Sequence, residues 1–278
     1  MGNIDKAKIL LKEFDSLDLQ EVQASTVKIT TEKTDELLEK YKTFVESHKG
    51  VYINSDLMKM VFEVYAKSPE NRNKYNLAVT NSAACLANEY YTRAVGNPQI
   101  KRCVYIAGPY GAGKSFLAQS LFVAGAIPED AIVYEGSITA PAFGKKVKLA
   151  IENGITPEIL IINPTLELSM KNIKEREKTT GRGVIKSEVV EKYADMYPNI
   201  EKLFDYLREE FPELAKEQSP VSFQIYNKES NVPEDISISY NLEELKHGTR
   251  QEVSEQYDAI KKKLGDSEPK VDSDDLCL

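Results

Sequence analysis

The residues with the clearest chemical meaning form one glycine-rich segment, Gly108-Pro109-Tyr110-Gly111-Ala112-Gly113-Lys114-Ser115. It matches the Walker A pattern G-x-x-x-x-G-K-[ST], whose backbone N–H groups cradle the phosphates of a nucleotide. In this pattern Lys114 reaches the β- and γ-phosphates, and the Ser115 hydroxyl binds Mg²⁺. An apolar run precedes the segment and an amphipathic run follows it, which is the strand–loop–helix context that the motif requires. The sequence therefore predicts binding of a nucleoside triphosphate such as ATP, together with Mg²⁺.

Glu135 is a carboxylate that a parallel sheet would bring to this loop. It directly follows the apolar residues Ile132-Val133-Tyr134. Because the carboxyl ends of parallel strands face the ligand crevice, Glu135 would point towards the phosphates. There it would hold Mg²⁺ through water or bind the acceptor. The alternative is a solvated acid at the end of a strand.

Asp56 is the second carboxylate of interest. It follows the short apolar run Val51–Asn54 and precedes a predicted helix that begins at Leu57. If that run is a strand beside the strand of the phosphate loop, Asp56 reaches the same crevice and can take a proton from an acceptor hydroxyl. Ser and Asp are also favoured N-cap residues, so Ser55 and Asp56 would cap the helix well. The residues alone favour the capping role.

Two arginines stand in a segment that would close over the nucleotide. Arg176 and Arg182 lie within residues 174–183, between two predicted helices and beside two glycines. A mobile lid here would stabilise negative charge on the migrating phosphoryl group. The alternative is a surface loop whose arginines pair with nearby glutamates. The sequence leaves both interpretations open.

The elements that must position these residues alternate, from Val51 onward, between short apolar runs and helical periods. This alternation is typical of a parallel sheet with connecting helices. The predicted strands are Val51–Asn54, Arg102–Ala107, Ala131–Tyr134, Glu158–Ile162 and Val221–Tyr226. The predicted helices are Leu57–Tyr65, Leu77–Val95, Lys114–Val123, Pro141–Asn153, Pro164–Lys178, Ser187–Glu210 and Leu242–Leu264. We therefore expect an α/β fold of the P-loop NTPase type, with helices on both faces of the sheet.

Residues 1–49 are predicted to form a helical appendage to this domain. Apolar residues recur at three- and four-residue steps from Ile4 to Leu17 and again from Leu37 to Val45. The polar, β-branched stretch Ala24–Thr34 is expected to link the two helices. Residues 50–265 would form the domain that carries the phosphate loop, and the acidic segment 266–278 is expected to be disordered.

Composition excludes several classes of protein. The chain has 36 Lys and Arg against 44 Asp and Glu, and this net charge of −8 argues against a protein that coats nucleic acid or an anionic membrane. Three cysteines without paired spacing and two histidines exclude a disulfide framework and a Cys/His zinc site. No apolar run reaches the ~18 residues of a membrane span, and the N-terminus lacks the apolar region of a secretory signal. A cytoplasmic protein is the default expectation.

Taken together, these motifs resemble the zeta toxin family of small-molecule kinases. The similarity rests on the glycine-rich loop, Tyr134-Glu135-Gly136-Ser137, the two-arginine segment and the late strand Phe223-Gln224-Ile225-Tyr226-Asn227, in the family's order. The family usually places its acidic strand after the phosphate loop, whereas Val51–Asp56 stands before it here. The Ser68–Arg72 run and Ala78-Val79-Thr80 resemble a zeta-toxin-like subgroup with this order. That subgroup often has His at the position of Thr80, so the acceptor site of this chain can differ.

The resemblance implies an ATP-dependent kinase. It would transfer the γ-phosphoryl group to a hydroxyl of a nucleotide sugar such as UDP-N-acetylglucosamine, or of a dinucleotide such as NAD. Asp56 would deprotonate the acceptor, which favours the base over the cap, and Glu135 would support the acceptor or Mg²⁺. Arg176 and Arg182 would form the lid, and Thr80 would line the acceptor site. Family members are often toxic and inhibited by an antitoxin helix, and some relatives are bacterial effectors, so an antitoxin partner and delivery into a host or target cell are also implied.

Two other classes of function stay open. A kinase that acts on polynucleotide ends or nucleosides is disfavoured by the net charge and by the absence of a basic stripe in the sequence. A nucleotide-dependent binding module without transfer chemistry is disfavoured by Asp56 and by the two-arginine segment. The sequence does not identify the acceptor, because acceptor choice depends on the shape of the pocket.

Overall fold

In the computed structural model, which describes residues 3–138, 142–180, 184–212, 221–232 and 235–264, six strands form one sheet. The strands are β1 (Tyr52–Asn54), β2 (Arg102–Ala107), β3 (Ala131–Gly136), β4 (Thr156–Pro164), β5 (Ser222–Lys228) and β6 (Ile236–Ser239). Their order is β1-β3-β2-β4-β5-β6, and the first five run parallel. Only β6 pairs antiparallel, at the edge. The predicted α/β class is confirmed, as are the five predicted strands; β6 was not predicted.

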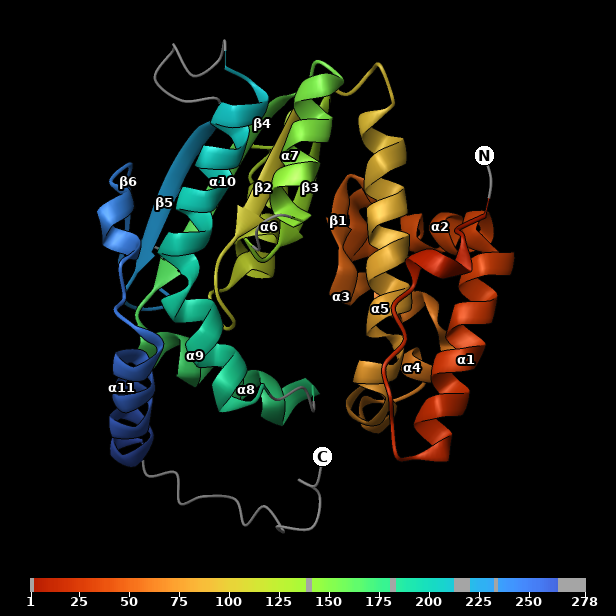
Figure 1. Ribbon diagram of the computed structural model, residues 1–278, viewed down its shortest axis with the longest axis horizontal. Helices are drawn as coiled ribbons and strands as arrows, with labels where there is room; N and C mark the ends of the chain where they lie inside the picture. Colours follow the sequence, from red (N-terminus) through yellow and green to blue (C-terminus); the bar gives the residue numbers. More distant parts are fainter. Residues whose placement is uncertain (1–2, 139–141, 181–183, 213–220, 233–234, 265–278) are drawn as a thin grey trace.

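Helices between the strands connect them and cover the sheet (Figure 1). The described helices are α1 (Leu17–Glu32), α2 (Thr34–Lys42), α3 (Ser55–Met58), α4 (Glu63–Ala66), α5 (Pro69–Val95), α6 (Lys114–Val123), α7 (Ala142–Glu152), α8 (Leu166–Thr180), α9 (Lys186–Ala194), α10 (Met196–Glu210) and α11 (Arg250–Lys263). Of these, α1 packs against α5, and α11 packs against α9. Short 3₁₀ turns occupy Lys6–Lys8, Val45–Gly50, Lys59–Val61 and Leu242–Leu245. None of the described helices combines the length and the apolar character that crossing a membrane requires.

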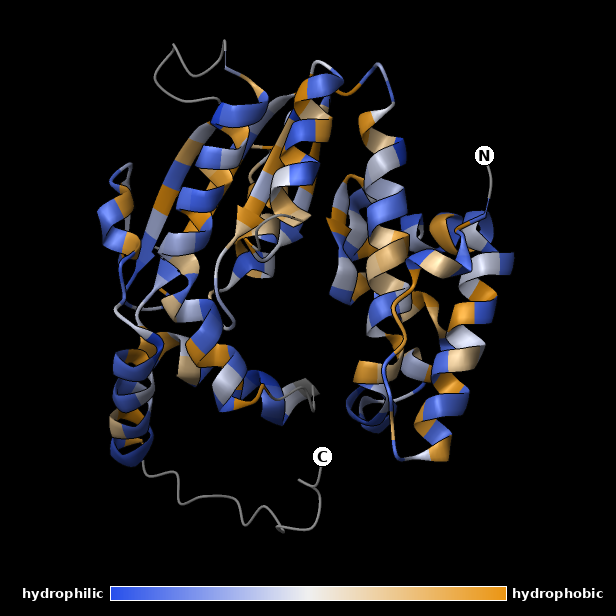
Figure 2. Ribbon diagram, viewed as in Figure 1, coloured by the Kyte–Doolittle hydropathy of each residue, from blue (hydrophilic) through white to orange (hydrophobic). Residues whose placement is uncertain are grey.

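Both faces of the sheet are buried. Alternate side chains of a strand point to opposite faces, and each face packs against helices. Val104 and Ile106 of β2 belong to an apolar cluster completed by α6. Cys103 and Tyr105 of the same strand belong to a larger cluster with residues of α5, α7 and α10. Figure 2 shows the result: the central strands are mostly hydrophobic, whereas the covering helices alternate between hydrophobic and hydrophilic residues.

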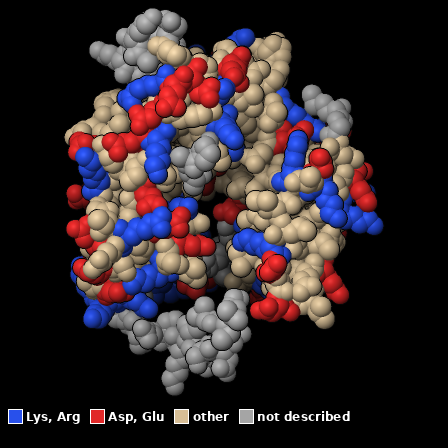
Figure 3. Space-filling view, viewed as in Figure 1, with Lys and Arg blue, Asp and Glu red and all other residues tan. Residues whose placement is uncertain are grey.

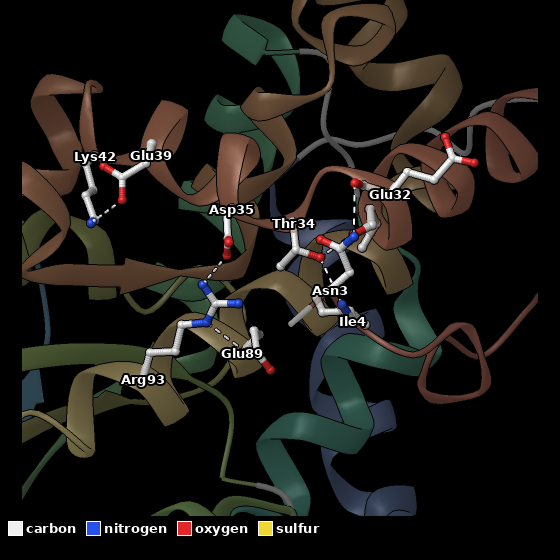
Figure 4. A network of polar contacts seen from close by, with 10 residues as sticks. Asn3, Ile4, Glu32, Thr34, Asp35, Glu39, Lys42, Glu89 and Arg93 are labelled. Atoms are coloured by element: carbon white, nitrogen blue, oxygen red, sulfur yellow. Dashed lines mark hydrogen bonds and ion pairs between the residues drawn. The ribbon is translucent and has the colours of Figure 1, made fainter. Parts of the chain in front are cut away.

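The N-terminal residues differ from the sequence expectation. The apolar residues from Ile4 onward form no continuous helix, and α1 begins only at Leu17. The predicted linker is helical, because α1 runs to Glu32 and α2 begins at Thr34. The Thr34 hydroxyl helps to hold the junction of α1 and α2. It donates to the Thr30 carbonyl oxygen at 2.7 Å and accepts from the Ile4 backbone N–H at 2.9 Å (Figure 4). The buried hydroxyl of Thr34, the first residue of α2, is thus satisfied by one local and one tertiary contact.

These N-terminal helices share the core of the sheet. Ile4, Leu37 and Tyr41 belong to the same apolar cluster as Ile53 of β1. Arg93 of α5 adds a polar contact by pairing with Asp35 at the start of α2 (Figure 4). The segment 266–278 lies outside the described residues.

Three predicted helices are broken where the backbone turns. The predicted helix Leu57–Tyr65 is interrupted at Phe62, which has extended backbone angles. The predicted helix Ser187–Glu210 is two helices that meet at Asp195. The predicted helix Leu242–Leu264 is a 3₁₀ turn followed by α11, with Gly248 at φ 98° between them. α5 is longer than predicted, because Ser68 caps it and Pro69 suits the first helical turn.

Candidate functional site

A cavity of about 950 Å³ lies at the carboxyl ends of the parallel strands. The glycine-rich loop after β2 forms its floor, α8 and the end of β5 bound one side, and α3 and α5 bound the other. Figure 1 shows these two sides, with α8 facing α3 and α4, and the space-filling view in Figure 3 is hollowed between them. The topology therefore brings residues that are distant in sequence to one edge of the sheet.

Glycine is required at two positions of the loop. Gly111 has a φ of 72°, and a Cβ there would lie 2.3 Å from the backbone oxygen of Ser169. A Cβ on Gly108 would lie 2.6 Å from the backbone oxygen of Ile162. The loop is thus seated directly on α8 and β4, and α6 begins at Lys114 with its N-terminus directed at the cavity. Such a helix N-terminus favours a bound anion.

The Lys114 side chain curls back over the loop. Its Nζ donates to the carbonyl oxygens of Gly108 at 3.1 Å and Pro109 at 2.9 Å. Burial lowers the pKa of Lys114, while the charges of Glu135 and Asp56 oppose this shift. Both carboxylates are therefore close enough to act on the ammonium, and Lys114 occupies a position from which it can turn towards a phosphate.

Glu135 takes part in a hydrogen-bond network rather than standing in solvent. Its Oε2 accepts from the Ser115 hydroxyl at 2.9 Å and also from the Tyr52 hydroxyl. The Tyr52 oxygen in turn accepts from Asn54 Nδ2 at 2.8 Å. Burial, followed by the charge of Glu135, raises the pKa of Tyr52, so the phenol stays protonated and donates. Tyr52, whose hydroxyl is itself held by Asn54, thus fixes the Glu135 carboxylate beside Ser115.

Asp56 is not the cap of its helix. The cap is Asn54, whose Oδ1 accepts from the backbone N–H groups of Asp56 at 2.7 Å and Leu57 at 2.9 Å. The prediction that Ser55 and Asp56 cap the helix is therefore wrong. The cap lies just before them, at Asn54, and asparagine caps a helix about as well as aspartate does. Asp56 instead lines the cavity.

An ion pair orients the Asp56 carboxylate. Its Oδ1 lies 2.9 Å from Lys59 Nζ, and the side chains of the two residues are 44% and 5% exposed, respectively. Lys59 Nζ also donates to Asn76 Oδ1 of α5 at 2.7 Å. The buried lysine therefore holds a partly exposed carboxylate in a defined position at the cavity wall.

The other predicted residues lie at the cavity or outside the described part of the chain. Arg176 lines the cavity from α8, and its charge helps to lower the pKa of Lys114. Arg176 stands on α8, which runs to Thr180, as the predicted helix Pro164–Lys178 implies and as the predicted lid between two helices does not. Arg182 lies outside the described residues. Thr80 lines the cavity from α5, where its hydroxyl donates to the Asn76 carbonyl oxygen at 2.6 Å.

Other residues at the cavity were also missed by the sequence analysis. Asn172 of α8 donates to the Gly111 carbonyl oxygen at 2.8 Å and so ties the loop to α8. Arg72 of α5 lines the cavity, and its buried Nε has no hydrogen-bond partner among the described residues. Lys228, the last residue of β5, lines the cavity and is 6% exposed. Lys228 could have been inferred from its place just after the predicted strand Val221–Tyr226, and Arg72 from its place at the end of the Ser68–Arg72 run. Asn172 carries no sequence signal.

The oxygen donors at the loop suit Mg²⁺ bound together with phosphates. No group of three or more His, Cys, Asp or Glu residues able to hold a metal occurs in the described ranges. Ser115 Oγ and Glu135 Oε2 stand 2.9 Å apart. Mg²⁺ usually takes one or two protein oxygens and completes its shell with water and phosphate, so this pair fits it.

Comparison of the sequence with known protein families found no match, and comparison with curated proteins found none either. The functional argument therefore rests on the chemistry of the cavity.

Proposed function

We propose that this protein is an ATP-dependent kinase of the P-loop type that phosphorylates a hydroxyl of a small anionic acceptor, of the nucleotide-sugar or dinucleotide class. The observation that carries the proposal is the position of Asp56, whose carboxylate opens on the same cavity as Lys114 and Ser115. A phosphate loop alone serves hydrolysis, binding or transfer. A carboxylate fixed across from it suits the deprotonation of an acceptor.

The strand order supports the P-loop assignment. The loop follows β2, which lies between β3 and β4. Glu135 comes from β3, and Asp56 follows β1, the next strand beyond. The loop thus sits at a switch point of a parallel sheet, the usual ligand site of this architecture.

In the proposed reaction, Lys114 turns from the loop carbonyls to the β- and γ-phosphates. Bound Mg²⁺, held by Ser115 with Glu135 behind it, would neutralise charge on the phosphate oxygens. The proton of the acceptor hydroxyl moves to Asp56 as the acceptor oxygen bonds to the γ-phosphorus. The bond from that phosphorus to the β–γ bridging oxygen breaks, and ADP leaves. Arg176 stabilises the charge on the migrating group.

An anionic acceptor is supported by Arg72. The buried Nε of this residue has no hydrogen-bond partner in the described part of the chain, and a buried donor without a partner is costly. Arg72 lies on α5, as does Thr80, on the Asp56 side of the cavity. Guanidinium groups bind phosphates through paired hydrogen bonds, so the diphosphate of a nucleotide sugar or dinucleotide fits this position.

The test is a search for the phosphorylated acceptor. The purified protein is incubated with ATP, Mg²⁺ and a metabolite extract, and mass spectrometry identifies compounds that gain one phosphoryl group. We expect gains on nucleotide sugars or dinucleotides, none with Lys114→Ala, and far smaller gains with Asp56→Asn. Gains confined to nucleic acid ends or nucleosides would favour the end kinase, and ATP binding without transfer would favour the binding module.

Toxicity and control by an antitoxin form a second part of the proposal, and they rest on the resemblance alone. Expression of the wild-type chain should arrest growth, and the Lys114→Ala chain should not. Normal growth with an active wild-type enzyme would remove this part and leave the kinase proposal intact.

A further inference from the structure

Lys228 is a buried cation to which the reaction described above gives no role. It ends β5, where its backbone carbonyl accepts from Thr165 N–H at 3.0 Å and fixes the start of its side chain. The residue is 6% exposed and lines the cavity. Its Nζ lies 3.2 Å from the point that a Cβ on Gly113 would occupy, and 6.0 Å from the centre of the Phe116 ring. The ammonium therefore stands directly over the junction between the phosphate loop and α6.

Within the part of the chain that the structure describes, no carboxylate compensates the charge of Lys228. Among the described residues, no Asp or Glu forms an ion pair with Lys228, and its one polar side-chain contact is Asn231 Oδ1 at 3.4 Å. Burial lowers the pKa of Lys228. Withdrawing an ammonium from water without an opposite charge is unfavourable. The burial of the Lys228 ammonium is explained if an anion binds in the adjacent space.

The surroundings of Lys228 hold it against the loop. Asn231 Nδ2 donates to Asn172 Oδ1 at 2.8 Å, and Asn172 Nδ2 donates to the Gly111 carbonyl oxygen at 2.8 Å. The segment after β5 is thus connected through α8 to the centre of the loop. Lys228 and the loop are parts of one hydrogen-bonded unit.

The sheet order decides which part of a nucleotide Lys228 faces. Asp56 and Glu135 belong to the β1–β3 side of the loop, whereas Lys228 comes from β5, on the β4 side. The γ-phosphoryl group must face Asp56 to be transferred. The phosphates that stay with the nucleoside then extend towards β5.

We propose that Lys228 is a second phosphate-binding lysine, which contacts the α- or β-phosphate that remains on ADP, on the opposite side of the loop from the acceptor. This inference rests on the proposed kinase function and adds a binding residue to it. Lys228 then contributes equally to ATP and ADP affinity, and little to the rate of transfer once the site is saturated.

Calorimetric titration with ATP, ADP and adenosine tests the proposal on Lys228→Met, Lys228→Arg and a control, Lys145→Met. Lys145 is exposed on α7 and does not line the cavity, so the control makes the same charge change elsewhere. We expect Lys228→Met to weaken ATP and ADP binding by about 10–100-fold, the range of a lost charged hydrogen bond. Adenosine binding and the kcat at saturating ATP should change little. Lys228→Arg should retain part of the affinity, and Lys145→Met all of it.

The outcomes separate this inference from the proposed function. A wild-type protein that does not bind ATP would remove the kinase proposal itself. A wild-type protein that binds ATP, with Lys228→Met binding ATP and ADP equally well, overturns the inference alone. A fall in kcat with unchanged affinity also overturns it, because Lys228 would then act on the transferred group. Thermal unfolding without nucleotide checks folding, and if Lys228→Met does not fold, Lys228→Gln is titrated in its place against the same expectations.

Discussion

The replacement Asp56→Asn separates the chemical role of this carboxylate from its structural role. The backbone N–H groups at the start of α3 are capped by Asn54, so the replacement leaves the cap intact. It removes the negative charge opposite Lys59, which is 5% exposed and keeps its hydrogen bond to Asn76. Two effects are therefore expected, one on turnover and one on stability.

Turnover should fall by about 10²–10⁴-fold, because an amide cannot accept the proton of the acceptor hydroxyl. The free energy of unfolding should fall by about 1–2 kcal/mol. This value lies between the 3–5 kcal/mol of a broken buried pair and the 0–1 kcal/mol of a surface pair, because Asp56 is 44% exposed while its partner is buried. ATP affinity should stay near that of the wild type.

The double variant Asp56→Asn/Lys59→Met is the matched control. Removing the lysine removes the buried charge that loses its ion pair with Asp56, so urea unfolding should show that stability is regained. Initial rates at saturating ATP should show that turnover is not. If Asp56→Asn turns over near the wild-type rate, Asp56 is not the base. If the double variant regains turnover together with stability, the loss was structural and the reasoning is refuted.

Three further replacements test the loop and the two sides of the cavity. Gly111→Ala should abolish ATP binding and lower stability by more than the control Gly154→Ala. Both glycines have φ near 70°, but a Cβ at Gly111 would lie 2.3 Å from a backbone oxygen, whereas a Cβ at Gly154 would have nothing within 4 Å. Equal unfolding free energies and intact ATP binding would contradict the close contact between the loop and α8. Arg176→Ala should lower kcat more than ATP affinity, with Arg176→Lys recovering part of the rate, because a single ammonium lacks the guanidinium fork; unchanged rates in both variants would make Arg176 an ordinary surface residue. Arg72→Met should raise the KM for the acceptor by about 10-fold or more without changing ATP affinity, the cost of losing a charged hydrogen bond; an unchanged KM would exclude Arg72 from acceptor binding.

The strand–loop–helix unit could be predicted in detail because its signals are local. β2 and α6 begin and end at the predicted residues, since an apolar strand, a glycine-rich turn and an amphipathic helix follow one another without interruption. Glu135 could likewise be placed at the cavity from its position at the end of a strand.

The rest depends on contacts between distant residues. Thr34 stabilises a helix in a stretch that reads as a linker because its partner, Ile4, lies thirty residues earlier. The edge strand β6 is only four residues long and is defined by its pairing with β5. Arg72 ends the Ser68–Arg72 run and Lys228 follows a predicted strand. Only the structure shows that Lys228 and the Arg72 Nε are buried, and that neither has a carboxylate partner among the described residues. No pattern along the chain carries that information.

Phosphorus NMR of a mixture of ATP, Mg²⁺ and an acceptor found by the metabolite search tests the central claim most directly. With the wild-type protein, the γ-phosphate signal of ATP should disappear as ADP forms and a new phosphomonoester signal appears in equal amount. The Lys114 ammonium contacts two loop carbonyls, and Lys114→Ala removes it. With this variant the ATP signals should persist while the protein stays folded. Growth of inorganic phosphate in place of the phosphomonoester, or transfer that is as fast with Lys114→Ala as with the wild type, would contradict the account.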